Sequence, residues 1–87
     1  MGFDNDVTNK LGIDLPIFSA PMGWVARPEL VAAVSEAGAM GLVPGSLPVD
    51  VVRDDIRRVR DLTARPFGVN IPIAFAQDPS IVEMVVT

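Results

Sequence analysis

The fold class is decided by LPIFSA at residues 15–20, PELVAAVSEAG at residues 28–38 and MGLV at residues 40–43. The first and last stretches are short apolar runs without polar alternation, which is typical of strands covered on both faces. The middle stretch predicts a helix, because Pro28 suits the first helical position, Glu29 complements the positive end of the helix dipole and Gly38 suits the C-terminal cap. Arg27, directly before it, is a poor N-cap. Together the three stretches predict a strand–helix–strand unit with parallel strands.

The same alternation continues along the chain. A second helix is predicted over residues 48–62, with Val49, Val52, Ile56 and Val59 spaced by threes and fours. FGVNI at residues 67–71 predicts a third strand, and Asp78 with Pro79 predicts the start of a third helix. Three βα units begin either a doubly wound sheet or an eight-fold barrel, which needs about 250 residues. The third helix stops without a glycine, a basic last turn or a proline, so we expect a fragment cut within a longer domain.

Composition narrows the function classes. The chain has 87 residues, 49% of them hydrophobic and 21% charged, so disorder is not expected. A net charge of −4 argues against a nucleic-acid partner or an anionic membrane surface. The chain has no Cys and no His, which excludes thiolate metal sites and activated Ser or Cys nucleophiles, and it favours the cytoplasm. We recognise no signal peptide and no membrane span.

The candidate functional residues follow the predicted strands, because ligands of parallel α/β folds bind at the carboxyl ends of the strands. Asn70 is either a ligand-facing amide or a polar strand terminus. The turn at residues 21–23 could expose backbone to a flat ring beside Met22, but the pattern alone favours a plain turn with Met22 as core filler. Trp24 is interpreted as a pocket wall or a rim residue. Gly45 and Ser46 predict a plain turn, although such a turn can also cradle a phosphate.

The charged residues of the second helix predict a solvated face rather than a phosphate patch. Its arginines at positions 53, 57, 58 and 60 are interleaved with Asp54, Asp55 and Asp61. The sequence contains no dinucleotide or Walker glycine motif in a strand–turn–helix context. No metal-binding cluster is predicted.

Three stretches resemble the N-terminal part of the nitronate monooxygenase (2-nitropropane dioxygenase-like) family. They are LGIDLPIFSAPM at residues 11–22, the helix at residues 28–38 and RPFGVNI at residues 65–71. The resemblance implies that residues 1–87 are the first three βα units of an FMN-binding TIM (β/α)8 barrel. Such enzymes oxidise alkyl nitronates with O2 to a carbonyl compound and nitrite. It also implies that Ala20, Pro21 and Met22 contact the flavin, largely through backbone, and that Asn70 hydrogen-bonds FMN.

The resemblance leaves the chemistry of this chain open in two respects. The family's catalytic histidine and its phosphate-binding glycine loops belong to later βα units, so no catalytic residue is assigned and the isolated chain is expected to be inactive. MGWVA at residues 22–26 resembles the related FMN-dependent enoyl-acyl-carrier-protein reductases, which would need NAD(P)H. A third interpretation is a non-catalytic truncated fragment that self-associates through an exposed sheet edge.

Overall fold

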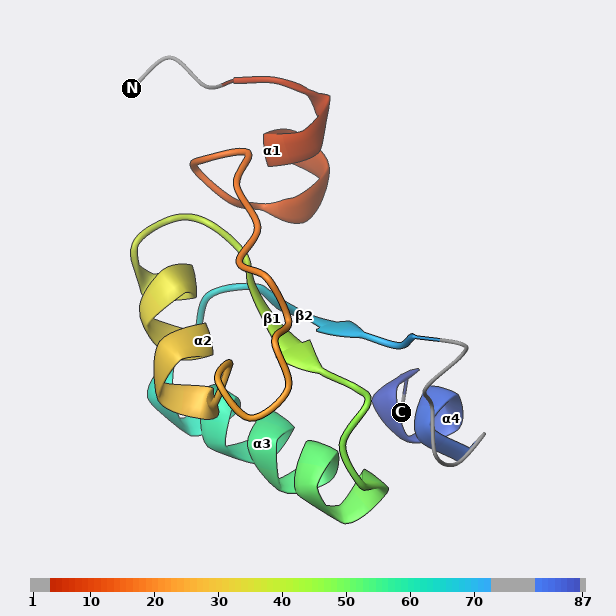
Figure 1. Cartoon of the computed structure of the whole chain (residues 1–87). Helices are drawn as coiled ribbons and strands as arrows, with labels where there is room; N and C mark the ends of the chain where they lie inside the picture. The colour runs from red at the N-terminus through yellow and green to blue at the C-terminus, as the bar shows by residue number, and fades with distance from the viewer. Residues whose placement is uncertain (1–3, 73–79, 87) are drawn as a thin grey trace.

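The chain folds into helices around a small parallel sheet, and the computed structural model describes residues 4–72 and 80–86 (Figure 1). Its elements in order are α1 (Asp6–Leu11), α2 (Pro28–Glu36), β1 (Gly41–Pro44), α3 (Val49–Leu62), β2 (Phe67–Asn70) and α4 (Ser80–Val86). Strands β1 and β2 are hydrogen-bonded neighbours and run parallel, in the register Gly41–Phe67 to Pro44–Asn70. The predicted α/β class with parallel strands is therefore confirmed.

The first predicted strand is much shorter than expected. Residues 15–20 contribute a single parallel bridge, between Phe18 and Met40. The Met40 N–H donates to Ile17 O and the Ser19 N–H donates to Met40 O, both at 3.0 Å, but the Leu42 N–H then donates to the Ser19 hydroxyl at 3.1 Å. A side chain thus takes the place of the next backbone acceptor. Pro16 within the run and Pro21 after it have no N–H to extend the ladder. The prediction of three complete βα units is not confirmed.

The two long helices follow the sequence pattern. Helix α2 begins at Pro28, and Arg27 before it makes no side-chain cap. Gly38 has a φ of 101°, a left-handed conformation that favours glycine, and it turns the chain from α2 into β1. Helix α3 starts one residue later than predicted and ends at Leu62 as expected. Asp78 and Pro79, the predicted start of the last helix, lie outside the described residues, and α4 is described from Ser80.

Helix α1 is not predicted by the apolar pattern. It is set up locally by a capping box, in which Thr8 N–H donates to the Asn5 side chain and Asn5 N–H donates to the Thr8 hydroxyl, each at 3.0 Å. Gly12, with a φ of 70°, ends the helix. The helix lies at one end of the molecule, above the sheet in Figure 1.

The core lies between the sheet and helices α2 and α3, which pack against each other and against β1. Its fully buried side chains include Val31, Val43, Val52 and Val59. Because side chains alternate along a strand, the helices cover the face that carries Val43 and Val69, while Leu42, Gly68 and Asn70 belong to the opposite face. No helix of the described residues is both long enough and apolar enough to cross a membrane.

Candidate functional site at the carboxyl edge of the sheet

Asn70 is the last residue of β2 and is paired in register with Pro44 of β1. It is half-buried and lies on the sheet face opposite α2 and α3. Within the part of the chain that the structure describes, its side-chain amide takes part in no hydrogen bond. An amide at a strand's carboxyl end with its donors and acceptor free is suited to recognise a ligand.

The turn after β1 is held against this residue. Gly45 and Ser46 form the predicted turn, and Gly45 is buried. A Cβ atom on residue 45 would lie 2.1 Å from the carbonyl oxygen of Asn70, which no real side chain tolerates. Glycine at position 45 is therefore required by close backbone approach, and the ends of β1 and β2 form one tightly packed edge.

The turn after the first bridge carries the other predicted contact residues. The Met22 carbonyl accepts hydrogen bonds from Val25 N–H at 2.9 Å and Ala26 N–H at 2.8 Å, and the Ala20 carbonyl accepts from Met22 N–H. The Ala20 N–H makes no hydrogen bond with another described residue. Met22 is 55% exposed and Pro21 is half-buried. The turn therefore presents a free backbone donor next to an exposed apolar side chain.

Gly23 in this turn is not required to be glycine. It does not have a positive φ, and a Cβ placed on it would meet no atom within 4 Å. Residue 23 therefore needs neither conformational freedom nor a close approach.

The structure brings the turn at residues 20–22 and Asn70 to the carboxyl edge of the sheet, on opposite sides of β1. Ala20, the first predicted contact residue of the turn, lies two residues beyond the Phe18–Met40 bridge and so falls level with Leu42, whereas Asn70 is level with Pro44. The offset of two residues corresponds to about 7 Å along the strands. Strand β1 separates the two groups, so a ligand that touched both would span β1. An extended planar molecule with polar and apolar parts meets that requirement.

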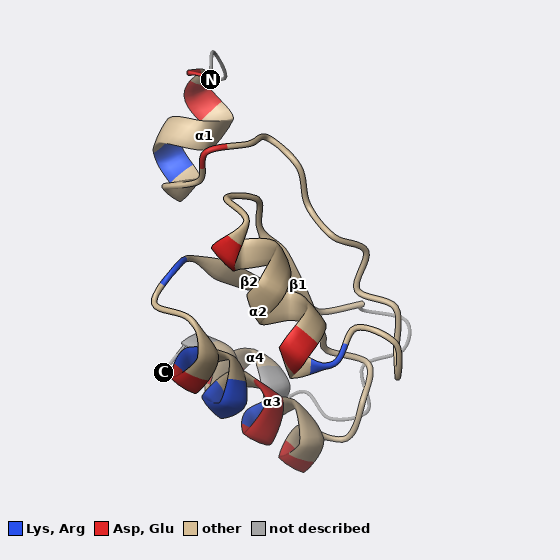
Figure 2. Ribbon diagram, turned by 90° about the vertical axis from the view of Figure 1, so that its left-hand side faces the viewer, with Lys and Arg blue, Asp and Glu red and all other residues tan. Residues whose placement is uncertain are grey.

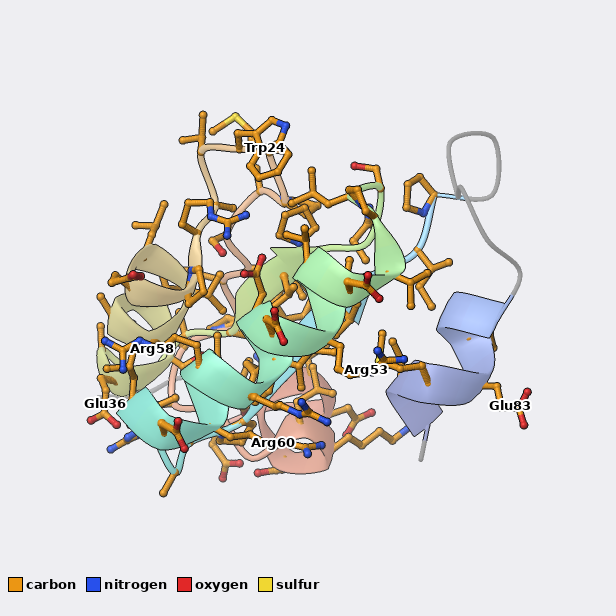
Figure 3. All side chains as sticks on the ribbon, turned by 90° about the horizontal axis from the view of Figure 1, so that it is seen from below. Trp24, Glu36, Arg53, Arg58, Arg60 and Glu83 are labelled. Carbon is orange, nitrogen blue, oxygen red and sulfur yellow. The ribbon has the colours of Figure 1, made fainter. Side chains whose placement is uncertain are left out.

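Trp24 belongs to a cluster that the sequence does not reveal. Its indole is 65% exposed, and the guanidinium carbon of Arg27 lies 5.1 Å from the ring centroid (Figure 3 labels Trp24). Arg27 Nη2 in turn donates to Asp55 Oδ1 of α3 at 2.9 Å. Trp24 therefore lies exposed beside the turn, within cation–π distance of a guanidinium that is hydrogen-bonded to α3.

The prediction of a wholly solvated charged face on α3 is wrong at Asp55, because this residue is only 3% exposed. Burial raises the pKa of the Asp55 carboxyl above its ordinary value of 3.8; Arg27 opposes this rise, and Asp54 and Glu29 add to it. The spacing holds a signal for this burial, because Asp55 lies three residues after Val52 and four before Val59 on the core stripe.

The remaining charges of α3 behave as predicted, with acidic and basic residues interleaved on its outer face (Figure 2). Arg53 pairs with the exposed Asp50 at 3.6 Å, a contact of small energetic value. Two hollows, of about 240 and 480 Å³, lie beside α3, α4 and the beginning of β2 and are lined partly by Arg53, Arg57 and Arg60. Neither is lined by the residues of the carboxyl edge. Among the described residues, no group of three or more His, Asp or Glu side chains could hold a metal ion.

Comparison with known proteins gives consistent results. A family model described as nitronate monooxygenase matches residues 5–84. The nitronate monooxygenase of Paraburkholderia phytofirmans is 48% identical over 62 residues, which cover 70% of this chain and 17% of that protein. A 5-hydroxy-7a-methyl-1-oxo-octahydro-1H-indene-4-carboxyl-CoA dehydrogenase of Mycobacterium tuberculosis is 36% identical over 81 residues, which cover 92% of this chain and 23% of that protein.

A solved structure supports the same relationship. FabK from Thermotoga maritima superposes with a TM-score of 0.75 and 40% identity, over 90% of this chain and 24% of that chain. The chain thus spans about a fifth of the length of the curated relatives named above, 17% and 23%. With a family match over 5–84 and this agreement in fold, the chain belongs to the nitronate monooxygenase family.

Proposed function

We propose that this chain supplies the N-terminal βα units of an FMN-dependent oxidoreductase barrel that oxidises alkyl nitronates with O2 to a carbonyl compound and nitrite. The observation that carries the proposal is the family match over residues 5–84, which includes all four predicted flavin contacts, Ala20, Pro21, Met22 and Asn70. No catalytic side chain is assigned here, so the chain by itself is proposed to be inactive. We propose a cytoplasmic location, which the lack of cysteine favours.

The carboxyl edge fits the cofactor chemically. A flavin ring has hydrogen-bonding atoms on a flat apolar body. This edge offers the exposed side chain of Met22, and it offers the Asn70 amide and the Ala20 N–H, neither of which is hydrogen-bonded to another residue within 4–72 and 80–86. When bound, FMN supplies the electron transfer. These residues would bind and orient it, since the Asn70 amide can both donate and accept a hydrogen bond and the turn at 20–22 offers a backbone donor and an apolar side chain. Gly45 keeps the ends of β1 and β2 together at this edge.

A second candidate is an FMN-dependent reductase that acts on an enoyl thioester with NAD(P)H. Two observations support it. Trp24 stands exposed beside the turn, within the MGWVA stretch that resembles the FMN-dependent enoyl-acyl-carrier-protein reductases. The Mycobacterium tuberculosis relative is named for a carboxyl-CoA compound, which is a thioester.

A third candidate is a non-catalytic chain that self-associates. The described residues between 17 and 25 include a group of large exposed apolar side chains, namely Ile17, Phe18, Met22, Trp24 and Val25. Apolar surface of this kind favours association. Concentration-dependent sedimentation of the purified chain tests this candidate, and a monomer at all concentrations would contradict it.

The two enzymatic candidates are separated by grafting. Residues 5–84 replace the corresponding segment of the Paraburkholderia phytofirmans nitronate monooxygenase, and the purified chimera is assayed for O2 consumption and nitrite release with an alkyl nitronate. The leading proposal predicts nitronate turnover with no requirement for NAD(P)H. The second candidate predicts bleaching of the flavin by anaerobic NAD(P)H and turnover of an enoyl thioester. A folded, flavin-loaded chimera that performs neither reaction would contradict both.

A further inference from the structure

Asp55 and Arg27 join two distant parts of the chain. They are 28 positions apart, and the bond of 2.9 Å connects α3 to the residue that precedes α2. The Asp55 side chain is only 4% exposed, whereas that of Arg27 is 36% exposed. A carboxylate buried beside Val52, Ile56 and Val59 requires a cationic partner, because an unpaired charge in such surroundings is strongly disfavoured.

Arg27 and Asp55 are joined by a single hydrogen bond. Asp55 Oδ2 and Arg27 Nη1 are both buried, and neither has a hydrogen-bond partner among the described residues. A guanidinium and a carboxylate commonly form two parallel hydrogen bonds, which would satisfy both atoms. Only one forms here, so the orientation of the guanidinium is not set by Asp55 alone.

Trp24 is the second partner of the guanidinium. The separation of 5.1 Å between Arg27 Cζ and the indole centroid lies within the range of a cation–π contact. The indole is otherwise exposed, and the residue belongs to the turn in which the Met22 carbonyl accepts from Val25 and Ala26. Arg27 is thus held between a buried carboxylate on α3 and an exposed indole on the turn.

We propose that Asp55 is a positioning residue: through Arg27 it fixes the indole of Trp24 beside the turn at residues 20–26, so that α3 sets the shape of the surface that receives the substrate. The consequence for substrate rests on the proposed function, because that turn carries the predicted flavin contacts. The placement of Trp24 itself is independent of FMN. An aliphatic or thioester chain entering beside the turn would meet a fixed aromatic wall rather than a mobile side chain.

The chain contains a single tryptophan and no tyrosine, so its fluorescence reports on Trp24 alone. Emission maximum and acrylamide quenching are compared for the full chain, Asp55→Asn, Arg27→Gln and the double variant. Asp54→Asn is the matched control, since Asp54 is the exposed neighbour on the same helix and its removal changes the net charge equally. Far-UV circular dichroism verifies that each variant remains folded.

We expect both single variants to shift the equilibrium from stacked to free indole by about two- to fivefold, as for a cation–π contact at an exposed site. The double variant adds little to either single one, because both act through the same contact. Arg27→Lys retains a cation and should return part of the wild-type signal. Emission and quenching in Asp55→Asn that match those of Asp54→Asn would overturn the proposal. If Asp55→Asn fails to fold, Arg27→Gln is compared with Asp54→Asn in its place, and a match there overturns the proposal equally.

A second readout separates this inference from the proposed function. In the flavin-loaded chimera, Asp55→Asn should raise KM for the substrate while the flavin content stays unchanged. A chimera that binds no flavin contradicts the proposed function but leaves the fluorescence result standing. If the chimera binds flavin but the Trp24 fluorescence of the isolated chain does not respond to Asp55→Asn, only the positioning role is contradicted.

Discussion

The backbone of Gly45 lies against the carbonyl oxygen of Asn70, so that a Cβ atom on residue 45 would stand 2.1 Å from that oxygen. The contact joins the turn after β1 to the last residue of β2 at the edge where parallel α/β folds bind ligands. It also explains why a glycine follows Pro44. The residue proposed to bind FMN is thus supported from behind by a turn that tolerates no side chain.

Gly45→Ala is expected to destabilise the fold by about 1–3 kcal/mol, because the new methyl group must displace backbone. Gly23→Ala is the matched control and should leave stability nearly unchanged, since position 23 is open and does not have a positive φ. Urea unfolding of both variants measures the difference. Equal stabilities would show that the edge yields to the methyl group.

Asn70→Ala is expected to weaken FMN retention in the chimera by about 1–3 kcal/mol, the cost of leaving a buried polar partner unsatisfied. Asn70→Asp removes the donor and keeps an acceptor, which shows the direction of the hydrogen bond. Flavin absorbance after gel filtration measures the bound fraction. Unchanged flavin content in Asn70→Ala would remove this residue from the proposed site.

Asn5→Ala is expected to cost about 1 kcal/mol of stability, because it removes the acceptor of the Thr8 N–H in the capping box. Asn9→Ala lies on the same helix at an exposed position and should be neutral or slightly stabilising, given the higher helix propensity of alanine. Thermal unfolding of both variants gives the comparison. A loss of stability in Asn9→Ala as large as in Asn5→Ala would contradict the capping role.

The raised pKa of Asp55 predicts that this residue's contribution to the free energy of unfolding depends on pH. Burial raises the pKa of this carboxyl above 3.8 in the folded chain, so between the two values the folded state binds more protons than the unfolded state. The contribution of Asp55 to the free energy of unfolding therefore falls as the pH rises from 3.8 through the folded pKa. Asp55→Asn cannot titrate, and the stability of the wild type relative to this variant should fall over the same window.

Urea titrations at a series of pH values check this expectation, with Asp61→Asn, an exposed position on the same helix, as the control for net charge. A gain in stability of the wild type relative to Asp55→Asn as the pH rises would mean that Arg27 outweighs burial. In that case the ion pair itself would be the stabilising feature.

Local signals in the sequence predict the helices well. Pro28 and Gly38 bound α2 as expected, and the threes-and-fours spacing of Val52, Ile56 and Val59 places the core face of α3. These features depend on neighbours along the chain, which a sequence displays directly. The α1 capping box is equally local, but it lies in a segment without an apolar stripe, so the apolar pattern does not indicate it.

Long-range pairings are not predictable in the same way. The apolar run at 15–20 suggests a full strand, yet the hydroxyl of Ser19 accepts the Leu42 N–H and ends the ladder after one bridge. The sequence places Asp55 among solvated charges, because its partner Arg27 is 28 positions away. At the carboxyl edge, sequence position correctly places Asn70 at a strand end, whereas its close contact with Gly45 depends on tertiary packing.

The most direct test of the central claim, that the carboxyl edge faces a flavin, is the visible absorption spectrum of the chimera after incubation with FMN and gel filtration. We predict that the folded chimera elutes with equimolar FMN. The 87-residue chain treated in the same way is predicted to elute without it, because the phosphate of FMN is expected to bind in later βα units. A chimera that is folded like its parent but elutes colourless would contradict the claim.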